Sequence, residues 1–430
     1  MKKRLLSALC AVMLLICAVP MASAQTGDAA RRADALTVLH LLSEDPGRDL
    51  TAPATRAQAA VLLVRLAGGE KKPDTDGWFA GFRDVPDWAR TAVNYANRRG
   101  WISGVSNVQF DPNGHLNADA WCAMLLRMLG YSDKTGDFEI SDAAAFAWRI
   151  GLTGRQLIGI LSMGDLAESI YDALDFCYKG TEATVLSRLM DLGVCTASAA
   201  NALGLLNKDY TARQLADRYL SAAFQLSLYE TEEQVHDEVS SADASGFFIS
   251  ADGLAVTNYH SIEDSIKATA TLLNGETYEV ERVLYYDTGI DIAVIKVSQT
   301  NQSRRTTSAF NHLDLVGTAD IRPGDPVYAI GNPLGLGLAI SSGIIGSTAH
   351  ELDRYALPCI VNSADISRGS SGGALMNAHG QVIGVTSGAY TYGNNMYLAV
   401  PVDPVMAADL TVSGWTLKEV KAIEAAKDKD

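Results

Sequence analysis

The stretch with the clearest chemical potential is 367–373, a run of three serines and three glycines interrupted by one arginine. A serine hydroxyl attacks a carbonyl when a base accepts its proton, an acid orients that base and N–H donors bind the oxyanion. Glycines on both sides of Ser371 let the backbone bend so that the N–H groups of Gly369 and Ser371 can converge. The pattern Gly-x-Ser-x-Gly alone also fits the nucleophile elbow of α/β-hydrolases.

Chain order separates these two interpretations. In the hydrolase elbow the acid and the histidine follow the serine. The one histidine after Ser371 is His379, eight residues later in a predicted hairpin turn, where it is a poor base. Upstream, His260 ends the β-type run 254–260, and Asp291 directly precedes the run 292–297. We therefore expect His260 as the base and Asp291 as the acid; Asp287, the alternative acid, stands before Thr-Gly in a turn context.

The elements that would carry these residues are short β-strands. After residue 220 the chain consists of apolar runs separated by Gly, Asn and Asp, which predicts a β-sandwich or barrel. The polar, acidic segment 230–244 is predicted to be a loop between the first two strands. The runs that read as strands are 223–229, 245–253, 254–260, 292–297, 326–331, 381–388 and 396–401.

Four motifs in this region resemble trypsin-like serine proteases of the HtrA type. They are SGFFISADGLAVTNYHSI, DTGIDIAVIKV, AIGNPLGLGLAISSGII and SRGSSGGALMNAHGQVIGV, in that order. The resemblance covers about residues 222–405 and implies a chymotrypsin/trypsin-like double β-barrel with the active site between the barrels. It implies that Ser371 attacks the scissile carbonyl, that His260 transfers the proton and that Asp291 orients His260. It also implies that the N–H groups of Gly369 and Ser371 form the oxyanion hole.

Two residues near the nucleophile bear on specificity. Asp365 precedes Ser371 by six residues, and in trypsin-like proteases that position can form the base of the pocket for the side chain before the cleaved bond. One hypothesis is that Asp365 favours Lys or Arg through charge pairing. The alternative is that Ile366 lines an apolar pocket while Asp365 faces solvent, as HtrA-type enzymes usually favour small aliphatic side chains. Ser370 replaces the asparagine that commonly precedes the nucleophile.

The N-terminus has the layout of an export signal. Residues 1–24 carry a basic start, an apolar run and Ala22-Ser23-Ala24, which predicts a cleaved secretory signal peptide. Four cysteines follow it. Cys122 and Cys177 lie in apolar helical patterns and are expected to be buried thiols, while a Cys177–Cys195 disulfide stays open.

Residues 25–215 read as helical and contain an internal repeat. The motifs F-x-D-V-P-x-W, A-x-x-x-G-x-I-S-G and F-x-P-x-G within 82–114, with T-R-A-Q at 55–58, resemble S-layer homology repeats over about 30–178. The resemblance implies an all-α module of about three repeats, the third degenerate, that binds cell-wall polymers of bacteria. The alternative is a helical array that serves only as a spacer.

These patterns together predict the domain order and the class of function. After the signal peptide and the repeats we expect a helical linker (179–221), the protease domain (222–412) and a charged helical tail (413–430), too short for a PDZ domain. The net charge of −15 argues against a nucleic-acid partner, and the sequence implies no metal or cofactor. We expect an exported, wall-associated serine endopeptidase acting on proteins, secreted if the repeats do not bind. The alternative is a wall-polymer-binding surface protein whose protease-like domain is inactive or only binds peptides.

Overall fold

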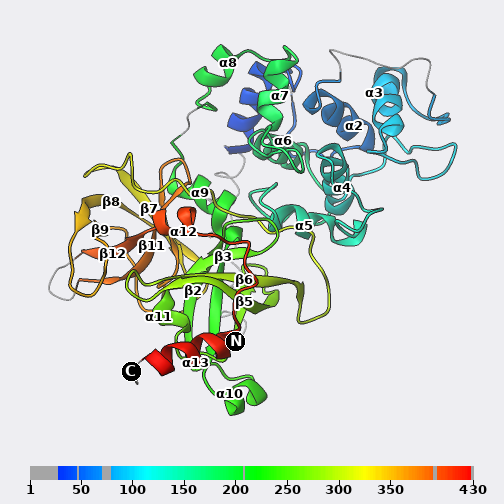
Figure 1. The fold of residues 1–430 in the computed structure, drawn as a ribbon. Helices are drawn as coiled ribbons and strands as arrows, with labels where there is room; N and C mark the ends of the chain where they lie inside the picture. The colour runs from blue at the N-terminus through cyan, green and yellow to red at the C-terminus, as the bar shows by residue number, and fades with distance from the viewer. Residues whose placement is uncertain (1–27, 46–47, 70–78, 207–208, 391–394, 428–430) are drawn as a thin grey trace, which may run out of the picture. The chain divides into compact units, whose positions relative to one another are not determined.

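The computed structural model describes residues 28–45, 48–69, 79–206, 209–390 and 395–427 (Figure 1). The predicted signal peptide lies outside these residues. The described chain divides into two compact units. One holds residues 28–147 and 156–206, and the other holds 148–155 together with the residues from 209 onward. No helix within the described ranges is long and apolar enough to cross a membrane.

The first unit is helical, as predicted for the N-terminal region. Residues 28–38 form its first helix. The following helices are α2 (Arg56–Leu66), α3 (Asp87–Arg98), α4 (Ala118–Met128), η1 (Ile140–Asp142), α5 (Ala143–Arg149), α6 (Met163–Ala173), α7 (Val185–Asp191) and α8 (Ala197–Ala202). Helix α9 (Ala212–Tyr219) and η2 (Leu220–Ala222) follow in the second unit.

Three of these helices begin in the same way. The side chains of Thr55, Asn117 and Ser162 cap α2, α4 and α6 by accepting a hydrogen bond from the N–H three residues later. The residues around these caps also pair with one another in a cycle. The paired residues are Pro53 with Ser162, Thr55 with His115, and Asn117 with Ile160. The three repeat-like segments are therefore joined at their helix N-termini.

One of the two cysteines expected to be buried in this unit is exposed. Cys122 is fully buried in α4, as its helical pattern predicts. Cys177 is exposed, because it follows α6 and pairs with Thr184 in a β-bridge rather than facing a helical core. Cys177 and Cys195 are both thiols, so the disulfide between them is not formed.

The second unit contains two closed antiparallel barrels of six strands, which confirms the predicted double barrel. The strand order is β1-β2-β3-β6-β5-β4 in the first and β10-β11-β12-β9-β8-β7 in the second. The first barrel comprises β1 (Ala223–Tyr229), β2 (Ala242–Phe248), β3 (Leu254–Thr257), β4 (Lys267–Leu272), β5 (Thr277–Asp287) and β6 (Ile292–Asn301). The second comprises β7 (Pro326–Gly331), β8 (Ala339–His350), β9 (Cys359–Asn362), β10 (Ala374–Asn377), β11 (Val382–Ala389) and β12 (Tyr397–Pro401).

Apolar burial holds the barrels together. In β1, Leu226 and Leu228 are buried while Ser227 between them is partly exposed, the period of two that a strand with one buried face requires. A buried cluster draws on both barrels, including Phe247 of β2 and Met376 of β10. The loops at the barrel ends are therefore fixed against a shared core.

Two local predictions need correction. His260 does not end a strand: β3 stops at Thr257, and His260 lies in the single helical turn α11 (Tyr259–Ile262). The segment 230–244 is also not one loop. It contains α10 (Glu232–Asp237), capped by the Thr231 side chain, and the beginning of β2.

The C-terminal segment folds onto the first barrel. After α12 (Asp403–Ala407) comes α13 (Leu417–Lys427), whose Leu417 and Val420 are buried in the same apolar cluster as Val283 of β5. The hydroxyl of Tyr286 donates to Glu424 Oε1 at 2.7 Å. Helix α13 is thus part of the packed domain.

Candidate active site

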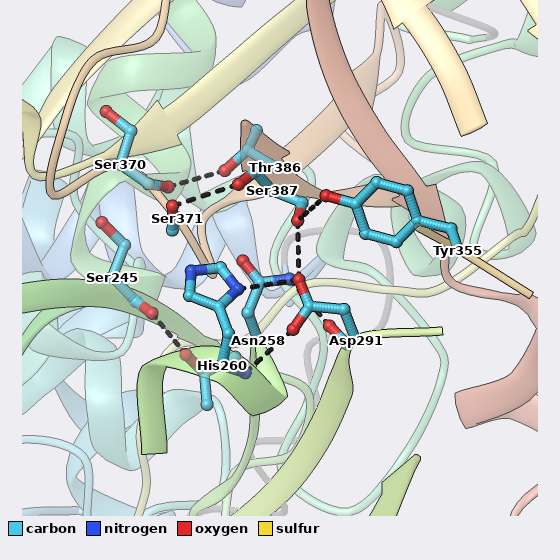
Figure 2. A network of polar contacts seen from close by, with 10 residues as sticks. Ser245, Asn258, His260, Asp291, Tyr355, Ser370, Ser371, Thr386 and Ser387 are labelled. Carbon is cyan, nitrogen blue, oxygen red and sulfur yellow. Dashed lines mark hydrogen bonds and ion pairs between the residues drawn. The ribbon is translucent and has the colours of Figure 1, made fainter. Parts of the chain in front are cut away.

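His260 and Asp291 form a close pair (Figure 2). His260 Nδ1 lies 2.8 Å from Asp291 Oδ2, and the backbone N–H of His260 donates to Asp291 Oδ1 at 2.9 Å. The helical turn α11 makes the second contact, because it turns the His260 N–H toward the loop between β5 and β6. Both carboxylate oxygens therefore hold the histidine, which fixes the orientation of its ring.

The backbone of Asp291 is held in an unusual conformation. Its φ is +60°, a left-handed geometry that residues other than glycine rarely adopt and that asparagine and aspartate tolerate best. The Asn258 side chain, fully buried, donates from Nδ2 to the Asp291 carbonyl at 2.8 Å. The conformation is thus stabilised by a specific contact, and it directs the carboxylate at His260.

Two further hydroxyls extend this pair. Ser387 Oγ, from β11, donates to Asp291 Oδ2 at 2.7 Å, and the Tyr355 hydroxyl lies 2.9 Å from Ser387 Oγ. Because the single proton of Ser387 goes to the carboxylate, Tyr355 must be the donor in the second bond. The chain of donors therefore runs from Tyr355 through Ser387 to Asp291.

This environment keeps Asp291 ionised. Burial of the carboxyl raises its pKa, but the hydrogen bond and charge of the His260 side chain, with the bonds from the His260 N–H and Ser387, outweigh burial and lower the pKa below its usual value. Burial also raises the pKa of the Tyr355 hydroxyl, which therefore stays protonated as a donor. A negative charge beside an imidazole stabilises its protonated form, so this arrangement suits His260 to act as a base.

Ser371 lies across from this pair on the loop that joins the 359–362 strand to β10. Its Oγ donates to the Ser387 carbonyl at 3.3 Å, and within the described part of the chain it makes no hydrogen bond to His260. Catalytic hydrogen bonds are often formed only in the substrate complex.

In the backbone around Ser371, the N–H groups of Gly369 and Ser371 have no protein acceptor among the described residues. The preceding carbonyl, that of Arg368, instead accepts the N–H of Leu334 at 2.7 Å. Gly369 has a φ of +93°, and a Cβ there would lie 2.6 Å from the Asn332 carbonyl oxygen. Only glycine fits this position, as the sequence pattern around the nucleophile indicates.

A pocket of about 210 Å³ lies beside the loop that carries Ser371. Asp365 and Ile366 line it together with Ser370 and residues of β7, β8 and β11. Asp365 is also solvent-exposed, and its carboxylate accepts a hydrogen bond from the Tyr397 hydroxyl. The two hypotheses about Asp365 and Ile366 are therefore compatible, because both residues line the pocket while Asp365 also contacts solvent.

Asp287 and His379, the alternative acid and base, make contacts outside the His260–Asp291 pair. The carboxylate of Asp287 accepts the N–H groups of Gly289 and Ile290, so it stabilises a turn. His379 is exposed in the turn between β10 and β11, with Nδ1 3.5 Å from Asp209 Oδ1. No group of three or more potential metal ligands occurs within the described ranges.

Some residues of this site carried no recognised signal in the sequence. Tyr355 lies in an irregular segment between β8 and β9, and nothing in its neighbourhood indicates a role. Ser387 falls within a run that reads only as a strand, and its hydroxyl meets Asp291 across 96 residues of chain. Their roles depend on contacts between distant segments.

Comparison with known proteins places this site in a family context. Residues 244–385 match the model of the trypsin-like peptidase domain. The chain is 37% identical over 171 residues to serine protease HTRA2, mitochondrial, of Bos taurus, which covers 39% of this chain and 35% of the relative. It is 35% identical over 177 residues to a probable periplasmic serine endoprotease DegP-like of Halomonas elongata, covering 40% and 35%. For serine protease HTRA1A of Danio rerio the identity is 32% over 196 residues, covering 44% and 39%.

The chain thus spans between 35% and 39% of the length of these curated relatives. The matched stretch includes His260, Asp291 and Ser371. Residues 244–385 therefore form a trypsin-like peptidase domain that is similar to the domains of HtrA-type serine proteases.

Proposed function

We propose that this protein is a serine endopeptidase that hydrolyses peptide bonds of proteins through Ser371, His260 and Asp291. The observation that carries the proposal is that the Asp291 carboxylate contacts both the ring and the backbone N–H of His260. Beside this pair lies Ser371, whose loop offers two N–H donors. The domain match and the relatives, which are named as serine proteases, support the same reaction. These relatives imply protein or peptide substrates.

The reaction follows from the positions of these groups. His260 accepts the proton of Ser371 as Oγ attacks the scissile carbonyl carbon, and the charge on the carbonyl oxygen is taken up by the N–H groups of Gly369 and Ser371. His260 then donates the proton to the departing amine, which leaves an acyl-enzyme on Ser371. Water, deprotonated by His260, hydrolyses the ester and restores the serine.

Labelling with a fluorophosphonate probe tests this proposal. The full chain should be labelled, and Ser371→Ala should remove the label. Ser367→Ala is the matched control, because Ser367 belongs to the same loop but is exposed and is not a proposed nucleophile. Absence of labelling, or labelling that survives Ser371→Ala, would overturn the proposal in favour of a protease-like domain that only binds peptides.

We further propose that the pocket lined by Asp365 and Ile366 receives the side chain that precedes the cleaved bond. Ile366 supplies an apolar wall, and the Asp365 carboxylate, held by Tyr397, attracts a Lys or Arg side chain. Cleavage profiling on a peptide library should show a share of Lys and Arg that falls in Asp365→Asn. An unchanged profile would leave the apolar wall as the determinant.

Export and attachment to a bacterial cell wall complete the proposal. The signal-like N-terminus and the periplasmic description of a relative support export, and the joined repeat-like helices support a wall-binding module. Within the 55–58 motif, Arg56 donates to the carbonyls of Phe110 and Ser103, so this arginine links neighbouring repeats. Co-sedimentation of the full chain with purified cell walls tests attachment; a chain that stays in the supernatant would favour a secreted enzyme.

A further inference from the structure

Ser245 of β2 is a buried serine of the first barrel whose polar groups contact the nucleophile loop. Its backbone N–H donates to the Ser371 carbonyl at 2.8 Å, and its Oγ donates to the Gly369 carbonyl at 2.7 Å. The same Oγ accepts the N–H of Asn332 at 2.8 Å. Ser245 has no solvent-exposed surface. One residue of the first barrel therefore joins two loops of the second.

These contacts bear on the two N–H groups proposed as the oxyanion hole. A peptide unit is planar and trans, so its C=O and N–H point in opposite directions. Fixing the Arg368 carbonyl on the Leu334 N–H therefore directs the Gly369 N–H to the other side of the loop. Fixing the Gly369 and Ser371 carbonyls on Ser245 restrains the peptide units 369–370 and 371–372, which flank the unit that carries the Ser371 N–H.

Ser245 also positions the loop that supplies the Leu334 donor. Asn332, whose N–H bonds Ser245 Oγ, lies two residues before Leu334. Leu334 has a left-handed φ of +58°, which costs energy for a residue other than glycine and persists when its surroundings impose it. The contact with Ser245 is therefore one of the restraints on the segment that holds the Arg368 carbonyl.

Two glycines allow the backbone to pack closely against Ser245. A Cβ on Gly331 would lie 3.0 Å from Ser245 Oγ, and a Cβ on Gly372 would lie 2.2 Å from the Ser245 carbonyl oxygen. Thr257 Oγ1 in turn donates to that carbonyl at 2.8 Å. The glycines on both loops allow the backbone to approach a serine whose own position is fixed.

We propose that Ser245 is a positioning residue that sets the oxyanion hole by orienting the peptide units around Gly369 and, through Asn332, the donor to Arg368. This inference rests on the proposed peptidase function. It predicts that loss of the hydroxyl lowers the rate of acyl transfer while leaving substrate binding largely intact, because Ser245 acts on groups that bind the transition state.

The test compares Ser245→Ala with Thr307→Ala, a matched control that removes a buried hydroxyl bonded to the Ala309 carbonyl, away from the nucleophile loop. With a fluorogenic peptide that the full chain cleaves, kcat of Ser245→Ala should fall about 10- to 100-fold, short of loss of a whole oxyanion donor, with KM within about threefold. Thr307→Ala should keep the kcat of the original chain. Equal kcat in the two variants would overturn the inference.

A second readout does not depend on catalysis. Amide hydrogen exchange over 366–373 should be faster in Ser245→Ala than in the original chain, and unchanged in Thr307→Ala. If the original chain resists the fluorophosphonate probe, the proposed function fails while this exchange experiment still tests the positioning. If Ser245→Ala does not fold, Gly331→Ala, which crowds the same Oγ, replaces it; unchanged exchange and kcat there would overturn the inference.

Discussion

Ser387→Ala is the substitution for which the structure gives the most specific expectation. The change removes the donor 2.7 Å from Asp291 Oδ2 and leaves the Tyr355 hydroxyl without its acceptor. A hydrogen bond to a charged group contributes about 1.5–3 kcal/mol. We therefore expect the free energy of unfolding at pH 7 to fall by about 2 kcal/mol.

The effect on catalysis should be smaller than loss of the acid itself. After Ser387→Ala, Asp291 still has both contacts to His260, so the ring keeps its orientation. Replacing the acid by its amide lowers kcat by about 10⁴ in proteases that use this mechanism, whereas we expect Ser387→Ala to lower kcat about tenfold, the equivalent of about 1.4 kcal/mol. Tyr355→Phe removes a bond between neutral groups, about 1 kcal/mol, and should lower kcat less than fivefold.

The stability effect should depend on pH in a defined direction. The folded-state pKa of Asp291 is lowered, so its interactions contribute stability that is full above the unfolded-state value of about 3.9 and is lost as pH falls through the folded-state value. Removing Ser387 raises the folded-state pKa. The difference in unfolding free energy between the original chain and Ser387→Ala should therefore narrow below about pH 4.

Peptide kinetics and urea unfolding across this pH range measure both effects. The ordering Asp291→Asn, Ser387→Ala, Tyr355→Phe, from largest to smallest loss of kcat, is the sharpest outcome. A Tyr355→Phe variant as impaired as Ser387→Ala would refute the directional chain of donors. A Ser387→Ala variant with unchanged kcat and stability would show that the His260 contacts alone hold Asp291.

Three further predictions concern separate contacts. Gly369→Ala places a Cβ 2.6 Å from the Asn332 oxygen at a φ of +93°, so kcat on the same peptide should fall by about 10² or more, as when an oxyanion donor is lost. The buried guanidinium of Arg149 lies 2.7 Å from the Glu276 carboxylate. Arg149→Met removes this ion-pair partner and should lower the free energy of unfolding, measured by urea titration, by about 3 kcal/mol. Arg56→Ala removes two hydrogen bonds between repeats and the stacking of the guanidinium on Phe110. The variant should therefore lower the thermal stability of the helical unit, measured by circular dichroism, and leave the rate of peptide hydrolysis unchanged.

The sequence carried the parts of this site that depend on local pattern. Strands such as β1 and β6 can be predicted from their alternating or continuous apolar residues, and Asp291 directly precedes the apolar run of β6. Gly369 could be predicted because a bend of that kind needs glycine. The turn α11 was missed because four residues are too few to show a helical period, so His260 read as part of the preceding strand.

The remaining contacts depend on the closed barrels. Tyr355 and Ser245 reach the site from segments that are distant in the chain, and hydroxyl residues have no spacing that marks a long-range partner. The Asp365–Tyr397 contact is of the same kind, joining residues 32 apart in sequence. Such pairs become neighbours only when strand order and register are known, and neither can be read from a single sequence.

The polar groups of the nucleophile loop show why these distant hydroxyls matter. Every carbonyl from Arg368 to Ser371 has a donor: Leu334 bonds Arg368, Ser245 bonds Gly369 and Ser371, and Thr386 Oγ1 bonds Ser370 at 2.6 Å. Within the described chain, the N–H groups of Gly369 and Ser371 have no matching acceptors. These N–H groups are therefore available to a substrate oxygen on which negative charge develops, as the proposed oxyanion hole requires.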